Sequence, residues 1–99
     1  MAKYHLSNKA VADLISIWDY TVRVWSKRQA ERYYNQIISA CSELSTKPQN
    51  GKRYSEIRSE LLGFKSGKHI IFYKILSKNE IVIYRILHEQ MDLDYRLLE

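Results

Sequence analysis

The sequence predicts a small α+β domain, in which an antiparallel pair of helices packs on one face of a small, mainly antiparallel sheet. Apolar residues recur at helical spacing through residues 7–44. Two apolar runs of strand length, residues 69–76 and 80–88, flank a polar turn. A short strand pattern at Lys3–Leu6 precedes the first helical segment. The expected element order is therefore β-α-α-β-β-β.

Composition places the chain among small single-domain proteins. Its 99 residues, 45% of them hydrophobic, are enough for one core, so residues 1–99 are expected to form a single domain. No apolar run approaches the roughly 20 residues of a membrane span, and the N-terminus lacks a secretory apolar region. The single cysteine fits a reducing compartment. We therefore expect a cytoplasmic location and no membrane contact.

Positive charge is concentrated in one third of the chain. Residues 47–78 hold eight Lys or Arg against two acids, a net charge of +6, and because the whole chain is +5 the remainder sums to −1. Such a segment attracts nucleic acid, an acidic protein or a phosphate-rich substrate. Solubility alone is the simpler interpretation.

The first helix is expected over residues 7–25 and the second from residue 26 onward. Ser7 is suited to cap the first helix, and Ser26 with Gln29 forms a capping-box pattern for the second. The periodic apolar positions are Val11, Leu14, Ile15, Trp18, Val22 and Trp25, followed by Ala30, Tyr33, Tyr34, Ile37, Ile38, Cys41 and Leu44. We interpret the aromatic residues and the cysteine of this stripe as core, and the near absence of a loop predicts an antiparallel helix hairpin.

The strand pattern predicts a binding face on the sheet. Ile81, Ile83, Arg85 and Leu87 alternate along the last strand and should share one face. An arginine is rarely buried without a partner, so this face is expected to point away from the helices, with Lys65 on the same side. An exposed aliphatic strip that carries cations suggests a surface covered by a second chain.

Several motifs are similar to those of a known family. RILHEQMD (residues 85–92), preceded by IRSELLGFKSGKHIIFYK (residues 57–74), resembles the ParE branch of the RelE/ParE toxin superfamily. The likeness extends to YHLSNKAVADLISIWDYT and WSKRQAERYYNQI, and so covers nearly the whole chain. It implies the same β-α-α-β-β-β fold and a toxin neutralised by a cognate ParD-like antitoxin whose C-terminal segment wraps it. ParE toxins inhibit DNA gyrase, whereas the RelE branch cleaves mRNA in the ribosome.

The residues leave both activities open but favour gyrase inhibition. RNA cleavage needs a base, an acid and cations, and Arg58, Lys65, Arg85 and His88 are candidates, with His69 beside them. The tail MDLDYRLLE, however, has a net charge of −2 and lacks the basic cluster of the mRNA-cleaving branch. We therefore expect a toxin that acts by binding and not as an enzyme. A plain nucleic-acid-binding domain ranks third, because the helices' exposed positions mix both signs.

The expected contacts with the antitoxin are Arg58, Lys65, Ile83, Arg85 and Leu87: its acids would meet the cations, and its aliphatic side chains the strip. His88 has a structural alternative, a hydrogen bond to a backbone carbonyl or to Asp92. The histidines are scattered, so neither a metal nor another cofactor is expected. The gyrase contact is expected in either the basic loop or the C-terminal tail.

Overall fold

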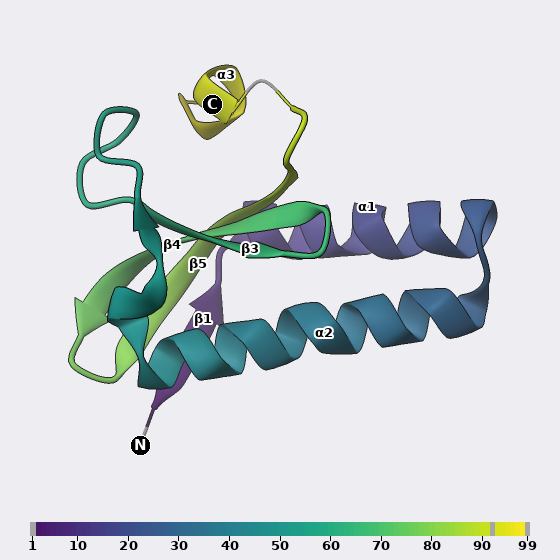
Figure 1. Cartoon of the computed structure of the whole chain (residues 1–99), viewed down its shortest axis with the longest axis horizontal. Coiled ribbons are helices and arrows are strands. Elements are labelled where there is room, and N and C mark those ends of the chain that lie inside the picture. The colour runs from purple at the N-terminus through teal and green to yellow at the C-terminus, as the bar shows by residue number, and fades with distance from the viewer. Residues whose placement is uncertain (1, 92, 99) are drawn as a thin grey trace.

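The computed structural model describes residues 2–91 and 93–98 (Figure 1). In chain order the elements are β1 (Lys3–Leu6), α1 (Asn8–Val24), α2 (Lys27–Thr46), the 3-10 turn η1 (Pro48–Asn50), β2 (Lys52–Arg53), β3 (Leu62–Ser66), β4 (His69–Ser77), β5 (Glu80–His88) and α3 (Leu93–Leu98). The expected α+β order is confirmed. The sequence did not predict η1, β2 or α3.

One five-stranded sheet in the order β1-β5-β4-β3-β2 organises the fold. β1 runs parallel to β5, and the other neighbours are antiparallel. The long β4–β5 hairpin is central, as its apolar sequence requires. In the described part of the chain no helix combines the length and the hydropathy needed to cross a bilayer.

The two long helices begin at the predicted caps. The Ser7 Oγ accepts a hydrogen bond from the Ala10 backbone N–H, and the Ser26 Oγ accepts one from the Gln29 N–H, each at 3.0 Å. These bonds satisfy backbone donors that a helix start would otherwise leave unpaired. Only Trp25 and Ser26 separate α1 from α2, so the helices must run antiparallel (Figure 1).

The sheet is covered on both faces. Between the helix pair and the sheet lies a cluster that includes Leu14, Ile37, Cys41, Tyr73 and Ile83. The opposite face carries a second cluster, made by Leu61, Ile70, Phe72, Leu87 and Leu97, with Tyr54, Ile57 and Leu93 packed against it. The loop after β2 and the helix α3 therefore close the face that the sequence analysis expected to be open.

Cys41 is a core residue, as its place in the apolar stripe predicts. Its side chain is fully buried, and burial raises the pKa of the thiol to about 12. A thiol in this state is not a nucleophile near neutral pH.

The turn between β3 and β4 depends on a glycine. Gly67 has φ +61°, and a Cβ there would lie 2.5 Å from Tyr33 Cε1. The absence of a side chain lets Tyr33 approach, and its hydroxyl accepts a hydrogen bond of 2.9 Å from the Lys68 backbone N–H. This contact fixes Tyr33 beside the start of β4.

Candidate functional site

A β-bulge changes the faces of β5. Phe72 pairs with Arg85, but Tyr73 pairs with Ile83, which leaves Tyr84 as an extra residue. Simple alternation therefore fails beyond Ile83. Ile83 and Ile86 both join the cluster under the helices, whereas Leu87 joins the cluster on the opposite face.

The prediction that Ile83, Arg85 and Leu87 form an exposed strip is therefore wrong. The exposed fractions are 0% for Ile83, 8% for Arg85 and 2% for Leu87. The helix pair covers Ile83, and the cluster that includes Leu61 and Leu97 covers Leu87. Their contact with an antitoxin stays a prediction, but the structure gives no exposed aliphatic surface at these positions.

Arg85 is buried with a partner from α1. The Asp13 carboxylate accepts hydrogen bonds from Arg85 Nε at 2.9 Å and from Nη2 at 3.0 Å, and a third from the Ile86 backbone N–H at 2.9 Å. β1 pairs with β5 only as far as Ile83. Beyond that point, the Asp13 carboxylate takes the place of a neighbouring strand and accepts the hydrogen bond from the Ile86 backbone N–H. The charge of Arg85 is thereby compensated inside the protein.

Arg85 and Arg58 both hold the C-terminal helix. Arg85 Nη1 donates to the Arg96 carbonyl at 3.1 Å, and Arg58 Nε donates to the Leu97 carbonyl at 3.2 Å. The Arg58 guanidinium also lies 5.0 Å from the centre of the Tyr84 ring. Cations that meet the last carbonyls of a helix stabilise it. Arg58 and Arg85, two of the predicted site residues, therefore have a structural role in holding α3.

Lys65 and His88, the two other predicted catalytic residues, contact Glu89 and Gln90, which directly follow β5. Lys65 Nζ is 2.9 Å from Glu89 Oε2, and this ion pair lowers the pKa of the Glu89 carboxyl. His88 Nδ1 accepts a hydrogen bond from the Gln90 backbone N–H at 3.1 Å. The alternative partner Asp92 lies outside the described residues.

A pair of histidines joins β4 to β5. The rings of His69 and His88 face each other edge to face with centroids 5.3 Å apart, and the Tyr33 hydroxyl lies 2.6 Å from His69 Nδ1. Burial, and secondarily the nearby His88, lower the pKa of His69 to about 4. His69 is therefore neutral at pH 7 and a weak base.

The structure brings only part of the predicted catalytic set together. Arg85, His69 and His88 line one cavity of about 190 Å³, which Arg58 and Lys65 do not reach. Within this cavity Arg85 is already bound by Asp13. Among the described residues, no group of three or more His, Cys, Asp or Glu is arranged to hold a metal ion.

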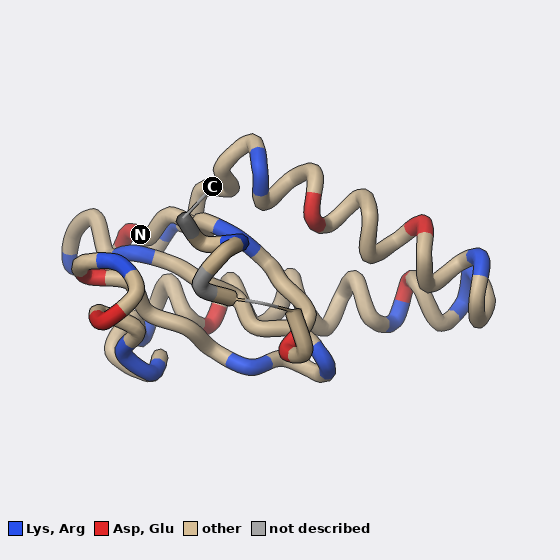
Figure 2. The backbone as a smooth tube through the Cα atoms, turned by 90° about the horizontal axis from the view of Figure 1, so that it is seen from above, with Lys and Arg blue, Asp and Glu red and all other residues tan. Residues whose placement is uncertain are grey.

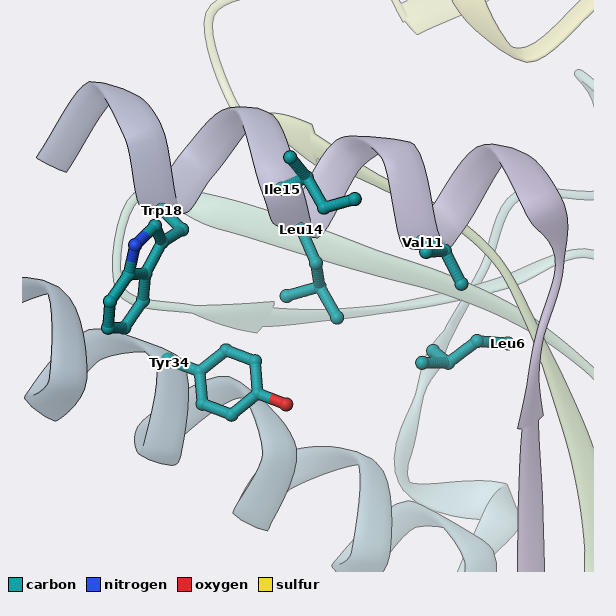
Figure 3. A pocket seen from close by; sticks show the side chains of 6 residues that line it. All are labelled: Leu6, Val11, Leu14, Ile15, Trp18 and Tyr34. Carbon is teal, nitrogen blue, oxygen red and sulfur yellow. The ribbon is translucent and has the colours of Figure 1, made fainter.

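An apolar groove on the helix hairpin was not predicted from the sequence. A hollow of about 270 Å³ lies between α1, α2 and the end of β1 (Figure 3). Its lining is entirely apolar or aromatic: Leu6, Val11, Leu14, Ile15, Trp18 and Tyr34. The side chains of Trp18 and Tyr34 meet edge to face across it, with centroids 6.1 Å apart.

The groove explains why the predicted core stripe of α1 is only partly buried. The buried positions of α1 are Ala10, Leu14 and Thr21, two of them small. Val11 and Ile15 are instead 41% and 57% exposed. α1 carries more large apolar residues than the core can bury. This excess is the feature of the sequence that could have indicated an interaction surface.

The low pKa of His69 predicts a pH-dependent stability. Unfolding returns this pKa from about 4 to its ordinary value of 6.5, so between these values the unfolded chain binds a proton that the folded protein does not. The free energy of unfolding should therefore fall as the pH drops from 7 to 5. His69 is partly exposed, so we expect a loss of about 1 kcal/mol.

Urea unfolding at pH 7, 6 and 5 measures this dependence. His69→Gln should flatten it, while His5 and His88 stay in both proteins. An equally steep pH dependence in the variant would contradict the assignment to His69.

Two long helices and a five-stranded mixed sheet that is covered on both faces define a small α+β protein, the class to which RelE/ParE-type toxins belong. The chain matches the family model described as "ParE toxin of type II toxin-antitoxin system, parDE" over residues 4–93. This chain belongs to the ParE family of type II toxin-antitoxin toxins.

Named relatives agree with that assignment. The chain is 34% identical to Toxin ParE1 of Mycobacterium tuberculosis (strain ATCC 25618 / H37Rv), over 97% of this chain and 98% of that protein. It is 32% identical to Toxin ParE1 of Caulobacter vibrioides, over 93% and 94% of the two chains. A solved structure titled "Chromosomal ParDE TA system from P. aeruginosa" shares the fold, with a TM-score of 0.74 at 23% identity over 89% of this chain and 96% of that chain.

Proposed function

We propose that this toxin inhibits DNA gyrase by binding, and that a ParD-type antitoxin neutralises it by seating apolar side chains in the groove between α1 and α2. The exposed apolar groove is the observation that carries the antitoxin part of the proposal. Membership of the ParE family supports the gyrase part.

The groove has the chemistry that an amphipathic segment requires. Its lining is apolar, and the exposed Val11, Ile15 and Tyr34 remain in water until a partner covers them. A helix or extended segment that places aliphatic side chains between α1 and α2 would remove that surface from water. Arg58 and Lys65 stay predicted contacts for the acids of such a segment.

The geometry gives less support to RNA cleavage. Asp13 compensates Arg85, Glu89 pairs with Lys65, and Arg58 donates to α3. His69 has a pKa too low for efficient proton transfer at pH 7. The cations predicted to stabilise the charge of a phosphorane during RNA cleavage are therefore already paired with groups of the protein. This arrangement favours a mechanism by binding.

Two parallel assays test the proposal. The purified toxin is added to a gyrase supercoiling reaction and to a translation extract analysed by primer extension. We expect loss of supercoiling that the antitoxin reverses, with intact transcripts. Cleaved transcripts together with unaffected supercoiling would reverse the assignment in favour of the mRNA-cleaving activity.

A further inference from the structure

The joined ends of α1 and α2 project beyond the sheet (Figure 1). We define residues 20–30 as the hairpin tip. Its large apolar side chains are in water: Trp25 is 72% exposed, Tyr20 55% and Val24 50%. Trp25 was predicted to lie in the core, and that prediction is wrong, because the hairpin is longer than the sheet it covers. The cost of leaving these side chains exposed points to a partner.

A concave site adjoins the tip. A cavity of about 450 Å³ lies where the projecting helix meets the end of the sheet; we call it the notch. Ile17, Tyr20 and Thr21 of α1 line one part of it, and His69, His88 and Met91 line another. Tyr20 belongs to both, so the tip and the notch form one continuous surface.

The charge of the tip is of one sign. Arg23, Lys27 and Arg28 are exposed, and residues 20–30 contain no acid; Asp19 and Glu31 flank this segment. Figure 2 shows Lys and Arg at the joined ends of the two helices. An acidic surface is the electrostatic complement of this region.

The residue types favour a protein partner over a nucleic acid. Trp, Tyr, Met and Arg are enriched at protein interfaces, and hot spots are enriched in Trp, Tyr and Arg. A nucleic-acid strand would need cations that follow its backbone. No Lys or Arg is among the described residues that line the notch, which are Ser16, Ile17, Tyr20, Thr21, His69, His88, Gln90 and Met91.

The notch and the antitoxin groove lie on different sides of α1. Tyr20 follows Val11 by nine residues, which at about 100° per residue places the two side chains half a turn apart around the helix. Val24 lies on the Tyr20 side, whereas Ile15 lines the groove. One helix thus presents two surfaces that separate partners can occupy.

We propose that the hairpin tip and the notch dock an acidic surface of the toxin's protein target, separately from the antitoxin groove. This inference rests on the proposed function, under which the target is DNA gyrase. Tyr20 and Val24 supply the apolar contact, and Arg23, Lys27 and Arg28 supply the charge.

Tyr20→Ala and Arg23→Glu test the proposal with purified gyrase. We expect each substitution to weaken gyrase binding at least tenfold in biolayer interferometry and to raise the toxin concentration for half-inhibition of supercoiling in parallel. Affinity for the antitoxin should stay within twofold of the unmodified protein. The thermal midpoint checks that both variants fold.

Arg53→Glu is the matched charge reversal, because Arg53 is exposed in the basic loop, one of the two places where the sequence predicts the gyrase contact. Gyrase inhibition that survives both tip substitutions, or that only Arg53→Glu weakens, would overturn this inference alone. An unmodified toxin without affinity for gyrase would overturn the proposed function and the inference with it. Tip-dependent binding of a DNA oligonucleotide without gyrase would assign the surface to nucleic acid and also overturn it.

Discussion

Asp13→Ala is expected to lower the free energy of unfolding by about 3–5 kcal/mol, the range found when one partner of a buried ion pair is removed. The side chains of Asp13 and Arg85 are only 14% and 10% exposed. The substitution removes the Asp13 carboxylate that accepts hydrogen bonds from the Arg85 guanidinium and from the Ile86 N–H. For a domain of this size the melting midpoint should fall by more than about 12 °C.

Equilibrium urea unfolding measures this effect against a matched ion pair. Lys65→Ala breaks the pair with Glu89, in which the lysine side chain is 64% exposed, so its cost should stay below about 1 kcal/mol. Asp13→Ala combined with Arg85→Leu should recover part of the lost stability, because the buried charge is removed. A loss from Asp13→Ala no larger than that from Lys65→Ala would show that the pair is not a structural element.

Local sequence signals predicted the main elements. Ser7 and Ser26 mark both helix starts because capping depends on residues three positions apart. The polar turn after Ser77 fixes the β4–β5 hairpin in the same local way. β2 and α3 were missed, because two and six residues give too short a pattern for periodicity to detect.

The candidate site was harder to predict because it depends on contacts distant in sequence. The pair of Asp13 and Arg85 joins residues 72 positions apart. Arg85 pairs with Phe72 and does lie on the face away from the helices, but the rule that an arginine is rarely buried gave the wrong exposure, because Asp13 and the Arg96 carbonyl pair with it inside the protein.

Nothing in the local pattern marks Tyr84 as the extra residue of a bulge. Because of that bulge, Ile83 and Leu87 lie on opposite faces of the sheet, and both are buried. The prediction that they form an exposed strip for the antitoxin was therefore wrong.

The helix stripe carried a functional signal that periodicity alone cannot separate from core packing. Ala10 and Thr21 are among the buried residues of α1, so the helix packs closely with small side chains. The larger Ile15 and Trp25 then remain available at the groove and at the tip. A helix whose large apolar residues exceed the core it must fill is typical of a protein that binds others.

Ile15→Asp is expected to weaken antitoxin binding by about 30-fold or more, the loss of one interface hot spot of at least about 2 kcal/mol. Ile15 is 57% exposed and lines the groove beside Trp18, so a charge there would be desolvated when an apolar segment docks. The substitution removes little buried surface from the free toxin, and the melting midpoint should change only slightly.

Isothermal titration with the purified antitoxin measures the effect, and Ile75→Asp is the matched control. Ile75 is 46% exposed on β4 and lies outside the groove lining, so the same chemical change there should leave antitoxin affinity within threefold. Gyrase inhibition by Ile15→Asp should stay intact, because Ile15 does not line the notch. Equal losses of antitoxin affinity in the two variants would place the antitoxin outside the groove, since only a contact specific to Ile15 separates them.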